Sequence, residues 1–396
     1  MRKKCIGQFT VILLWAGIVC VACSQPEKSG NLSRAKQLLD AVNARYSVKG
    51  TTLLRENYPF DANYSATYLA SADTGSKKQF AYLWPFSGTF SAVNALLKAS
   101  KDNRFLKILE TRTLPALHQY YNVALQPPCY ASYLNGAGWS DRFYDDNVWL
   151  GIDFAELFFY TGKQVYLDKA KEIWTFILSG IDDELGGGIY WCEQRKRSKN
   201  TCSNAPGSVL AFKLFEATRD SVFFYQGLEL YNWTKEKLQD PEDKLYWDNI
   251  SLNGRISRTK YPYNSGQMLQ SAALLYKLTK DKQYLQEAQD IAEASINYFT
   301  RDFTAGNGET FRMIRQGNVW FVAVMMRGFI ELYHLDSNKK YLEIFNRNLD
   351  YVWNHARDEN GLFSDSWDGS SRKTLKWLLD QAAFIEMYAS ISSIEF

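Results

Sequence analysis

An internal repeat constrains the fold of this chain more than any other feature. Five segments share a polar turn followed by an aromatic residue, and these aromatic residues are 61, 57, 61 and 57 positions apart: Phe105, Tyr166, Phe223, Tyr284 and Tyr341. A regular period of this length is typical of proteins built from stacked helical units. The sequence therefore predicts repeats of about 60 residues.

Each repeat contains two kinds of helix. In the second repeat, apolar residues recur at helical spacing from Val165 to Ile177 with charged residues between them, which predicts an amphipathic outer helix. The segment before the turn, Asn147 to Tyr160, is apolar on nearly all faces, which is typical of a helix buried on most sides. Six such buried helices are expected to begin near Ser87, Asp146, Asn204, Asn264, Asn318 and Gln381.

Six inner and six outer helices alternate when the amphipathic stretch Ser33–Tyr46 is counted as the first outer helix. This count predicts an all-α fold, an (α/α)6 toroid whose inner helices begin around one mouth. An open superhelical solenoid is the alternative, but six units without a polar capping repeat favour closure. Long loops with glycine and aromatic residues precede the inner helices, so binding groups are expected at that rim.

The amino end has the pattern of an export signal. Arg2, Lys3 and Lys4 precede an apolar run over residues 9–22, which is too short and wrongly flanked for a membrane-spanning helix. Ala22-Cys23 resembles the end of a bacterial lipobox, in which Cys23 is lipidated and becomes the new N-terminus. We expect a signal peptide over 1–22, a polar tether over 23–32 and one (α/α)6 domain over 33–396. The lipid would then hold an exported protein in the bacterial envelope, and simple secretion is the alternative.

Charge and composition exclude several classes of protein. Lys and Arg number 46 against 43 Asp and Glu, and loss of the three basic residues of the signal balances them at 43 each. A neutral chain has no basic field for nucleic acid, so that partner is not expected. The 12 Trp, 25 Tyr and 24 Phe residues fit either sugar stacking or a large aromatic core.

The usual metal and nucleophile motifs are missing from the sequence. The three histidines form no His-x-x-x-His pair, and no Gly-x-Ser-x-Gly elbow occurs, so neither a metal site nor a serine hydrolase is expected. Besides Cys23, three cysteines remain after the signal: Cys192 and Cys202 are close enough to close a small disulfide loop, with Cys129 left over. Three separate buried thiols is the other interpretation.

Carboxylates are the remaining chemistry, and one pair stands out in the segment Tyr144-Asp145-Asp146-Asn147-Val148-Trp149. An N-cap with a first-turn acid would need only one aspartate. Two carboxyl groups about 5–5.5 Å apart suit a retaining glycosidase, because the pKa of one rises and keeps it an acid while the other stays ionised. Asp145 and Asp146 are therefore candidate catalytic residues.

At this motif the sequence resembles glycoside hydrolase family 76, the α-1,6-mannanases, whose hallmark is adjacent aspartates in Tyr-Asp-Asp-Asn-x-Trp. The similarity continues in order through residues 187–191, 199–204, 263–266, 361–363 and Trp367. It departs at 316–321, where the family often carries a lysine.

The resemblance implies a retaining, endo-acting (α/α)6 enzyme that needs no cofactor, with Asp145 as nucleophile and Asp146 as acid/base. It also implies that Asn204, Tyr263 and Asn264 face the cleft. Their places at the predicted mouth make Trp84, Trp191, Trp320 and Trp367 candidates for sugar stacking, and Tyr144 and Asn147 flank the pair as candidate substrate contacts.

The leading hypothesis is thus an endo-α-1,6-mannosidase of fungal-type mannan, acting as a monomer on mannan or manno-oligosaccharides and touching the membrane only through its lipid. The alternatives are a related α-glycan hydrolase or transglycosylase, a non-catalytic glycan-binding lipoprotein, and a structural solenoid.

Overall fold

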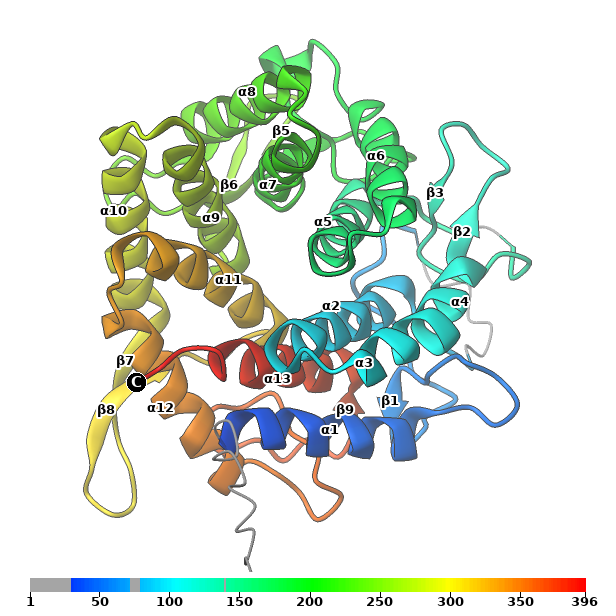
Figure 1. The fold of residues 1–396 in the computed structure, drawn as a ribbon, viewed down its shortest axis with the longest axis vertical. Helices are drawn as coiled ribbons and strands as arrows, with labels where there is room; N and C mark the ends of the chain where they lie inside the picture. Colours follow the sequence, from blue (N-terminus) through cyan, green and yellow to red (C-terminus); the bar gives the residue numbers. More distant parts are fainter. Residues whose placement is uncertain (1–29, 72–78, 139) are drawn as a thin grey trace, which may run out of the picture.

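The helices form two concentric rings (Figure 1). The computed structural model describes residues 30–71, 79–138 and 140–396. The inner ring consists of α2 (Leu83–Ser100), α5 (Tyr144–Thr161), α7 (Thr201–Thr218), α9 (Pro262–Thr279), α11 (Val319–Asp336) and α13 (Leu378–Ile391). The outer ring consists of α1 (Gly30–Tyr46), α3 (Asn103–Ile108) continuing into α4 (Leu114–Leu117), α6 (Gln164–Leu178), α8 (Ser221–Leu238), α10 (Lys282–Phe299) and α12 (Lys340–His355).

The inner ring is closed. Each inner helix contacts the next, and α13 returns to contact α2. The first outer helix, α1, also packs against α13, so the two ends of the described chain meet in one repeat. These contacts confirm the predicted (α/α)6 toroid and exclude an open superhelix.

Short turns join each inner helix to the outer helix that follows it. Five inner helices end at a residue with left-handed backbone, namely Lys101, Gly162, Arg219, Lys280 and Ser337. In three repeats an aspartate then caps the outer helix by accepting from the amide two residues on. These are the polar turns that the sequence repeat marked.

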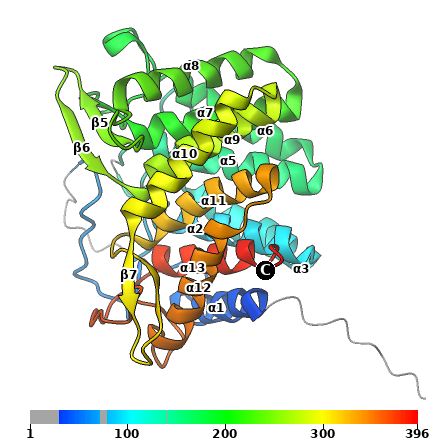
Figure 2. The same ribbon diagram turned by 90° about the vertical axis from the view of Figure 1, so that its left-hand side faces the viewer.

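The long loops carry small antiparallel sheets, and the strands labelled in Figure 2 lie at one end of the ring. The pairs are β1 (Asn57–Tyr58) with β9 (Lys376–Trp377), β2 (Tyr121–Asn122) with β3 (Cys129–Tyr130), and β7 (Thr300–Thr304) with β8 (Thr310–Ile314), beside the sheet β4 (Ser198–Asn200), β5 (Trp247–Ser251), β6 (Ile256–Lys260). The loops that precede the inner helices therefore form the rim of the predicted mouth.

Two details differ from the sequence prediction or decide between its alternatives. Helix α1 begins at Gly30 rather than Ser33, because Asn31 and Leu32 are already buried and Asn31 donates to Asn346. The last residues of the predicted tether therefore belong to this helix. Cys129, Cys192 and Cys202 are all free and buried, in agreement with three separate thiols. The predicted signal peptide and Cys23 lie outside the described residues.

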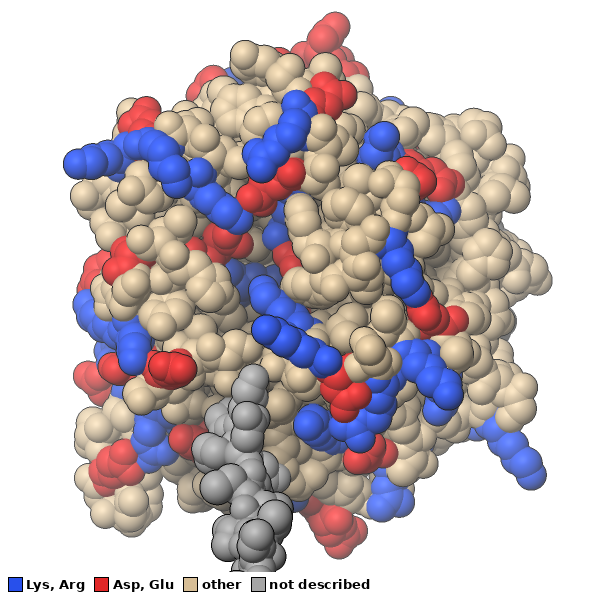
Figure 3. Space-filling view, in the orientation of Figure 1, with Lys and Arg blue, Asp and Glu red and all other residues tan. Residues whose placement is uncertain are grey.

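The opposite face, with the short turns, carries interspersed positive and negative side chains and no large patch of one sign (Figure 3). Within the part of the chain that the structure describes, no helix is long and apolar enough to cross a membrane.

Candidate active site

A cavity of about 460 Å³ opens at the rim where the inner helices begin. Its walls come from the first turns of α2, α5, α7, α9 and α11, and from loop residues that include Asn200, Asp248 and Tyr261. Because the ring closes, residues far apart in sequence meet here.

Asp145 and Asp146 both lie on this cavity, in the first turn of α5. The helix begins there because Phe143 is extended and pairs with Cys192, while the amide of Tyr144 donates to the carbonyl of Trp191 at 3.0 Å. The strand-like segment before the helix thus presents both carboxyl groups at the floor of the mouth. A helix N-terminus also favours a negative charge at this place.

The two carboxyl groups have unequal surroundings. Asp145 accepts three hydrogen bonds, from the indole Nε1 of Trp191 (3.1 Å), from Cys202 Sγ (3.4 Å) and from the amide of Asp146 (3.1 Å). Burial raises the pKa of Asp145 to about 7, although these three donors oppose that rise. Burial and the charge of Asp145 raise the pKa of Asp146 well above its ordinary value, with a further contribution from Asp141. Of the two, Asp145 is therefore the group that loses its proton first, and Asp146 is the group that stays protonated.

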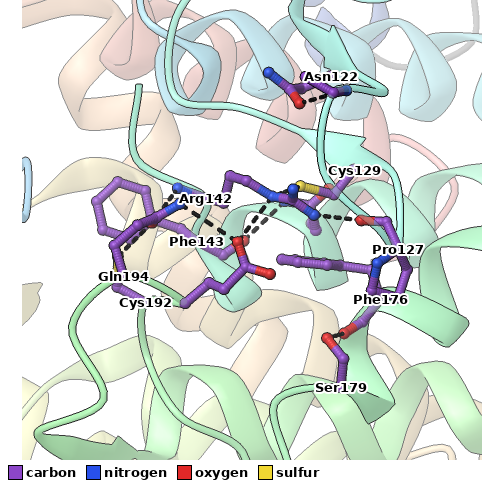
Figure 4. Close-up of polar contacts among 12 residues, drawn as sticks. Asn122, Pro127, Cys129, Arg142, Phe143, Phe176, Ser179, Cys192 and Gln194 are labelled. Carbon is purple, nitrogen blue, oxygen red and sulfur yellow. Dashed lines mark hydrogen bonds and ion pairs between the residues drawn. The ribbon is translucent and has the colours of Figure 1, made fainter. Parts of the chain in front are cut away.

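A buried arginine anchors the segment that carries the pair (Figure 4). The guanidinium of Arg142 contacts Cys129 Sγ and the carboxylate of Glu193, each at 3.0 Å from Nε, and lies over the ring of Phe176. The amide of Arg142 donates to Gln194 at 2.9 Å. These contacts tie the start of α5 to two neighbouring loops and hold the backbone in place before Asp145.

Aromatic rings form much of the remaining wall. Tyr263 stacks on Phe321 with ring centroids 3.9 Å apart and planes 6° apart, and Trp84 packs edge to face on Trp320 at 5.6 Å. Such faces suit the apolar faces of sugar rings. Trp84, Trp191, Tyr263 and Trp320, all singled out by the sequence, line the cavity with the aspartate pair.

Other predicted contact residues do not line the cavity. The ring of Tyr144 stacks on Phe176 at 4.7 Å, Trp367 is buried against Phe384 at 5.3 Å, and Asn264 lies beside Asp248. Their positions in the structure place them behind the wall, so the sequence prediction of direct substrate contact differs from the structure at these residues.

Asn147 and Asn204 are likewise fully buried, and every hydrogen bond they make goes to backbone. Asn204 accepts from the amide of Ile189 and donates to the carbonyls of Ile189 and Asn200, and Asn147 does the same with Tyr130 and Phe143. Each amide therefore fastens a rim loop to its inner helix, which is the reason that it does not reach the cavity.

Three residues at the site or directly behind it were not predicted from the sequence. Asp248, on β5, adds a third carboxylate whose pKa burial raises, and Cys202 contacts Asp145 directly. Glu56 lies behind the wall and accepts from Trp377, Tyr68 and the amide of Tyr82. The run Tyr246-Trp247-Asp248-Asn249, which again joins aromatic residues to an acid and an amide, was the available signal for Asp248.

The described residues contain no group of three His, Cys, Asp or Glu side chains able to hold a metal ion. The chemistry that the site offers is proton transfer and nucleophilic attack by carboxyl groups.

Paired carboxyl groups between stacking aromatic rings are the apparatus of glycoside hydrolases, and the toroid places them at the mouth of a closed ring. The sequence model of glycosyl hydrolase family 76 matches residues 58–307, and the chain belongs to this family.

Solved structures agree with this assignment. A family 76 glycoside hydrolase from a bovine strain of Bacteroides thetaiotaomicron is 32% identical with a TM-score of 0.84, over 92% of this chain and 78% of that one. A family 76 mannosidase of B. thetaiotaomicron VPI-5482 is 30% identical with a TM-score of 0.84, over 92% and 98% of the two chains. An α-1,6-mannanase of a Salegentibacter species, an inactive variant in complex with α-1,6-mannotriose, has the same fold at 22% identity and a TM-score of 0.71, over 91% and 99%. A comparison with curated protein sequences finds no match.

Proposed function

We propose that this protein is an endo-acting α-1,6-mannosidase that cleaves mannan backbones with retention of configuration. The main support for the proposal is the unequal environment of two aspartates on one cavity. Asp145 accepts from three hydrogen-bond donors, whereas the pKa of Asp146 is strongly raised.

In the first step, the ionised carboxylate of Asp145 attacks C1 of the mannosyl unit while Asp146 donates its proton to the departing O6. This forms a mannosyl ester on Asp145 and releases the other part of the chain. In the second step, Asp146 takes a proton from water, which attacks C1 and restores the original configuration.

The relatives support the choice of substrate. The Salegentibacter α-1,6-mannanase binds α-1,6-mannotriose in a variant that lost activity when two consecutive aspartates were replaced, and the B. thetaiotaomicron relative is a mannosidase. Asp145 and Asp146 are also consecutive, and the aromatic cavity at this site is large enough to enclose a sugar unit.

Incubation with linear α-1,6-mannan, followed by chromatography, tests the activity. We expect a ladder of manno-oligosaccharides early in the reaction, because an endo-acting enzyme cuts inside chains. The double variant Asp145→Asn/Asp146→Asn keeps the shape of the site and should release none. Wild-type protein that binds mannan without turnover would instead indicate a glycan-binding lipoprotein, and products longer than the substrate would indicate transglycosylation.

Proton NMR of the first-formed product tests the stereochemistry. Retention predicts that the α-anomer appears first and mutarotates later. An initial β-anomer would contradict the double-displacement mechanism.

We also propose that the protein acts in the cell envelope as a monomer anchored through lipidated Cys23. Labelling with a radioactive fatty acid should mark the wild-type chain and not the Cys23→Ala variant. A chain that is released unlabelled into the medium would favour simple secretion.

A further inference from the structure

Cys202 is a buried thiol in direct contact with the nucleophile. It lies in the first turn of α7, its exposed fraction is 3%, and it lines the cavity. Its Sγ is 3.4 Å from Oδ2 of Asp145, the same oxygen that accepts from Trp191 at 3.1 Å. Burial, then the charge of Asp145, raises the pKa of the thiol well above its ordinary value, so the sulfur carries its proton and donates it in this hydrogen bond.

The charge of Asp145 depends on such neutral donors. Among the described residues, the cavity lining contains no Lys, Arg or His. The titratable groups that face Asp145 and Cys202 from neighbouring elements include Asp146 of α5, Asp248 of β5 and the phenols of Tyr261 and Tyr263 at the start of α9. None of these groups supplies a positive charge, so the indole, the thiol and the backbone amides of Asp145 and Asp146 are the groups that favour the anion.

The structure holds the thiol in this position. Thr201, the residue before it, donates to the carbonyl of Trp247, and Asn204 fastens the same turn to the rim loop at Ile189. Lys199 is completely buried and donates to Asp182, Glu184 and Gly187. The first turn of α7 is therefore fixed on three sides, and the thiol needs no rearrangement to meet Asp145.

We propose that Cys202 is a positioning residue for the glycosidase reaction: its S–H group donates to Oδ2 of Asp145 and, with Trp191, orients this carboxylate and keeps it ionised. This inference rests on the proposed role of Asp145 as the nucleophile. It assigns the cysteine a part in turnover that simple core packing would not have.

Two variants separate the hydrogen bond from the space that the side chain fills. Cys202→Ala removes the donor, whereas Cys202→Ser keeps a donor of similar size. Loss of the donor raises the pKa of Asp145, and the nucleophile must be ionised to react. In the pH profile of kcat/KM on α-1,6-mannan, the acid limb of Cys202→Ala should therefore lie about 0.5 to 1 pH unit above that of the wild type. The value of kcat should fall with KM near that of the wild type. In Cys202→Ser the acid limb should return to the wild-type position.

Cys192→Ala is the matched control. Cys192 is equally buried and close in sequence, but its thiol donates to Gln194 and to neither aspartate. Its acid limb should coincide with that of the wild type. An acid limb that is the same in the wild type and in Cys202→Ala would overturn the proposal.

Infrared spectroscopy provides a test that needs no turnover. The S–H stretching band lies in a spectral window with little other protein absorption, and subtraction of the Cys202→Ala spectrum identifies the band of Cys202. We expect this band to shift to higher frequency in Asp145→Asn, because a neutral amide oxygen accepts more weakly than a carboxylate, and to stay unchanged in Cys192→Ala. An S–H band at the same frequency in the wild type and in Asp145→Asn would contradict the contact. If the wild-type protein turned over no mannan, the proposed function would fail while this band still tested the contact.

Discussion

At the scale of single residues, the site depends on a difference between two neighbouring aspartates of identical chemistry. Asp145 accepts from Trp191, Cys202 and the amide of Asp146, whereas burial and the charge of its neighbour keep the proton on Asp146. The proposed roles of nucleophile and acid rest on these surroundings and not on the order of the residues along the chain.

The variant Asp146→Ala tests this division of roles. Its kcat on α-1,6-mannan should fall by about 10²- to 10⁴-fold, because the departing O6 receives no proton. With an aryl mannoside that has a good leaving group, Asp146→Ala should still complete the first step. Stopped-flow measurement should then show a burst of released phenol. Asp145→Ala should show no burst with either substrate. A burst in Asp145→Ala would reverse the assignment.

Glu56 is a second residue whose environment defines its role. It is buried behind the aromatic wall, and its carboxyl accepts from Trp377 at 2.6 Å, from Tyr68 at 2.8 Å and from the amide of Tyr82 at 2.9 Å. Tyr68 and Tyr82 line the cavity, and the ring of Trp377 packs edge to face on Trp84. Glu56 is therefore placed to orient the wall, and it does not itself line the cavity.

In Glu56→Gln, one side-chain oxygen becomes an amide nitrogen, which cannot accept from the tyrosine or the indole. We expect KM for mannan to rise about three- to tenfold, as for the loss of roughly one hydrogen bond, with kcat changed much less. Steady-state kinetics measures both values. A fall in kcat at constant KM would place the effect of Glu56 on the aspartate pair instead.

At the scale of elements, one arrangement of hydrogen bonds between helix and loop recurs around the ring. The fourth residue of an inner helix fastens the preceding rim loop by hydrogen bonds to backbone: Asn147 in α5, Asn204 in α7, Ser265 in α9 and Gln381 in α13. Two of the polar residues at which the sequence placed helix starts, Asn204 and Gln381, thus connect a loop to its helix.

Asn204→Ala tests this role against substrate contact. It leaves the amide and carbonyl of Ile189 buried without their partner, so the free energy of unfolding should fall by about 2–4 kcal/mol. Urea denaturation measures the loss, and KM of the folded fraction should stay near the wild-type value. Wild-type stability with a raised KM would show that Asn204 faces the substrate, as the family resemblance implied.

At the scale of the whole molecule, the closed ring buries carboxyl groups other than the aspartate pair. Burial raises the pKa of Glu56, Asp153 and Asp380 to about 7 each, with Asp380 raised further by Asp365. Asp153 lies two turns beyond Asp146 on α5, where Ser91 donates to it at 2.6 Å. The native ring therefore holds protons that an unfolded chain releases.

This excess of bound protons predicts how stability depends on pH. Between the ordinary carboxyl pKa of about 4 and the raised value near 7, the native state binds more protons than the unfolded state, so the free energy of unfolding should decrease as pH rises through this window. Urea denaturation at several pH values measures the slope. The neutral isostere in Asp153→Asn should reduce the slope, and a stability that rises from pH 5 to 7 would contradict the prediction.

The sequence alone determined the architecture and singled out the aspartate pair, because both are local in their signals. A helix reveals its burial through its own periodicity, the turns at Asp102, Asp220 and Asp281 recur at a regular spacing, and Asp145 and Asp146 are adjacent in the chain. Only the tertiary structure decided which side chains surround that pair. Cys202 and Trp191 contact Asp145, Asp248 reaches the cavity from a hairpin, and Asn147 and Asn204 lie behind the wall. All of these positions depend on ring closure, which sets distances between residues that no sequence spacing encodes.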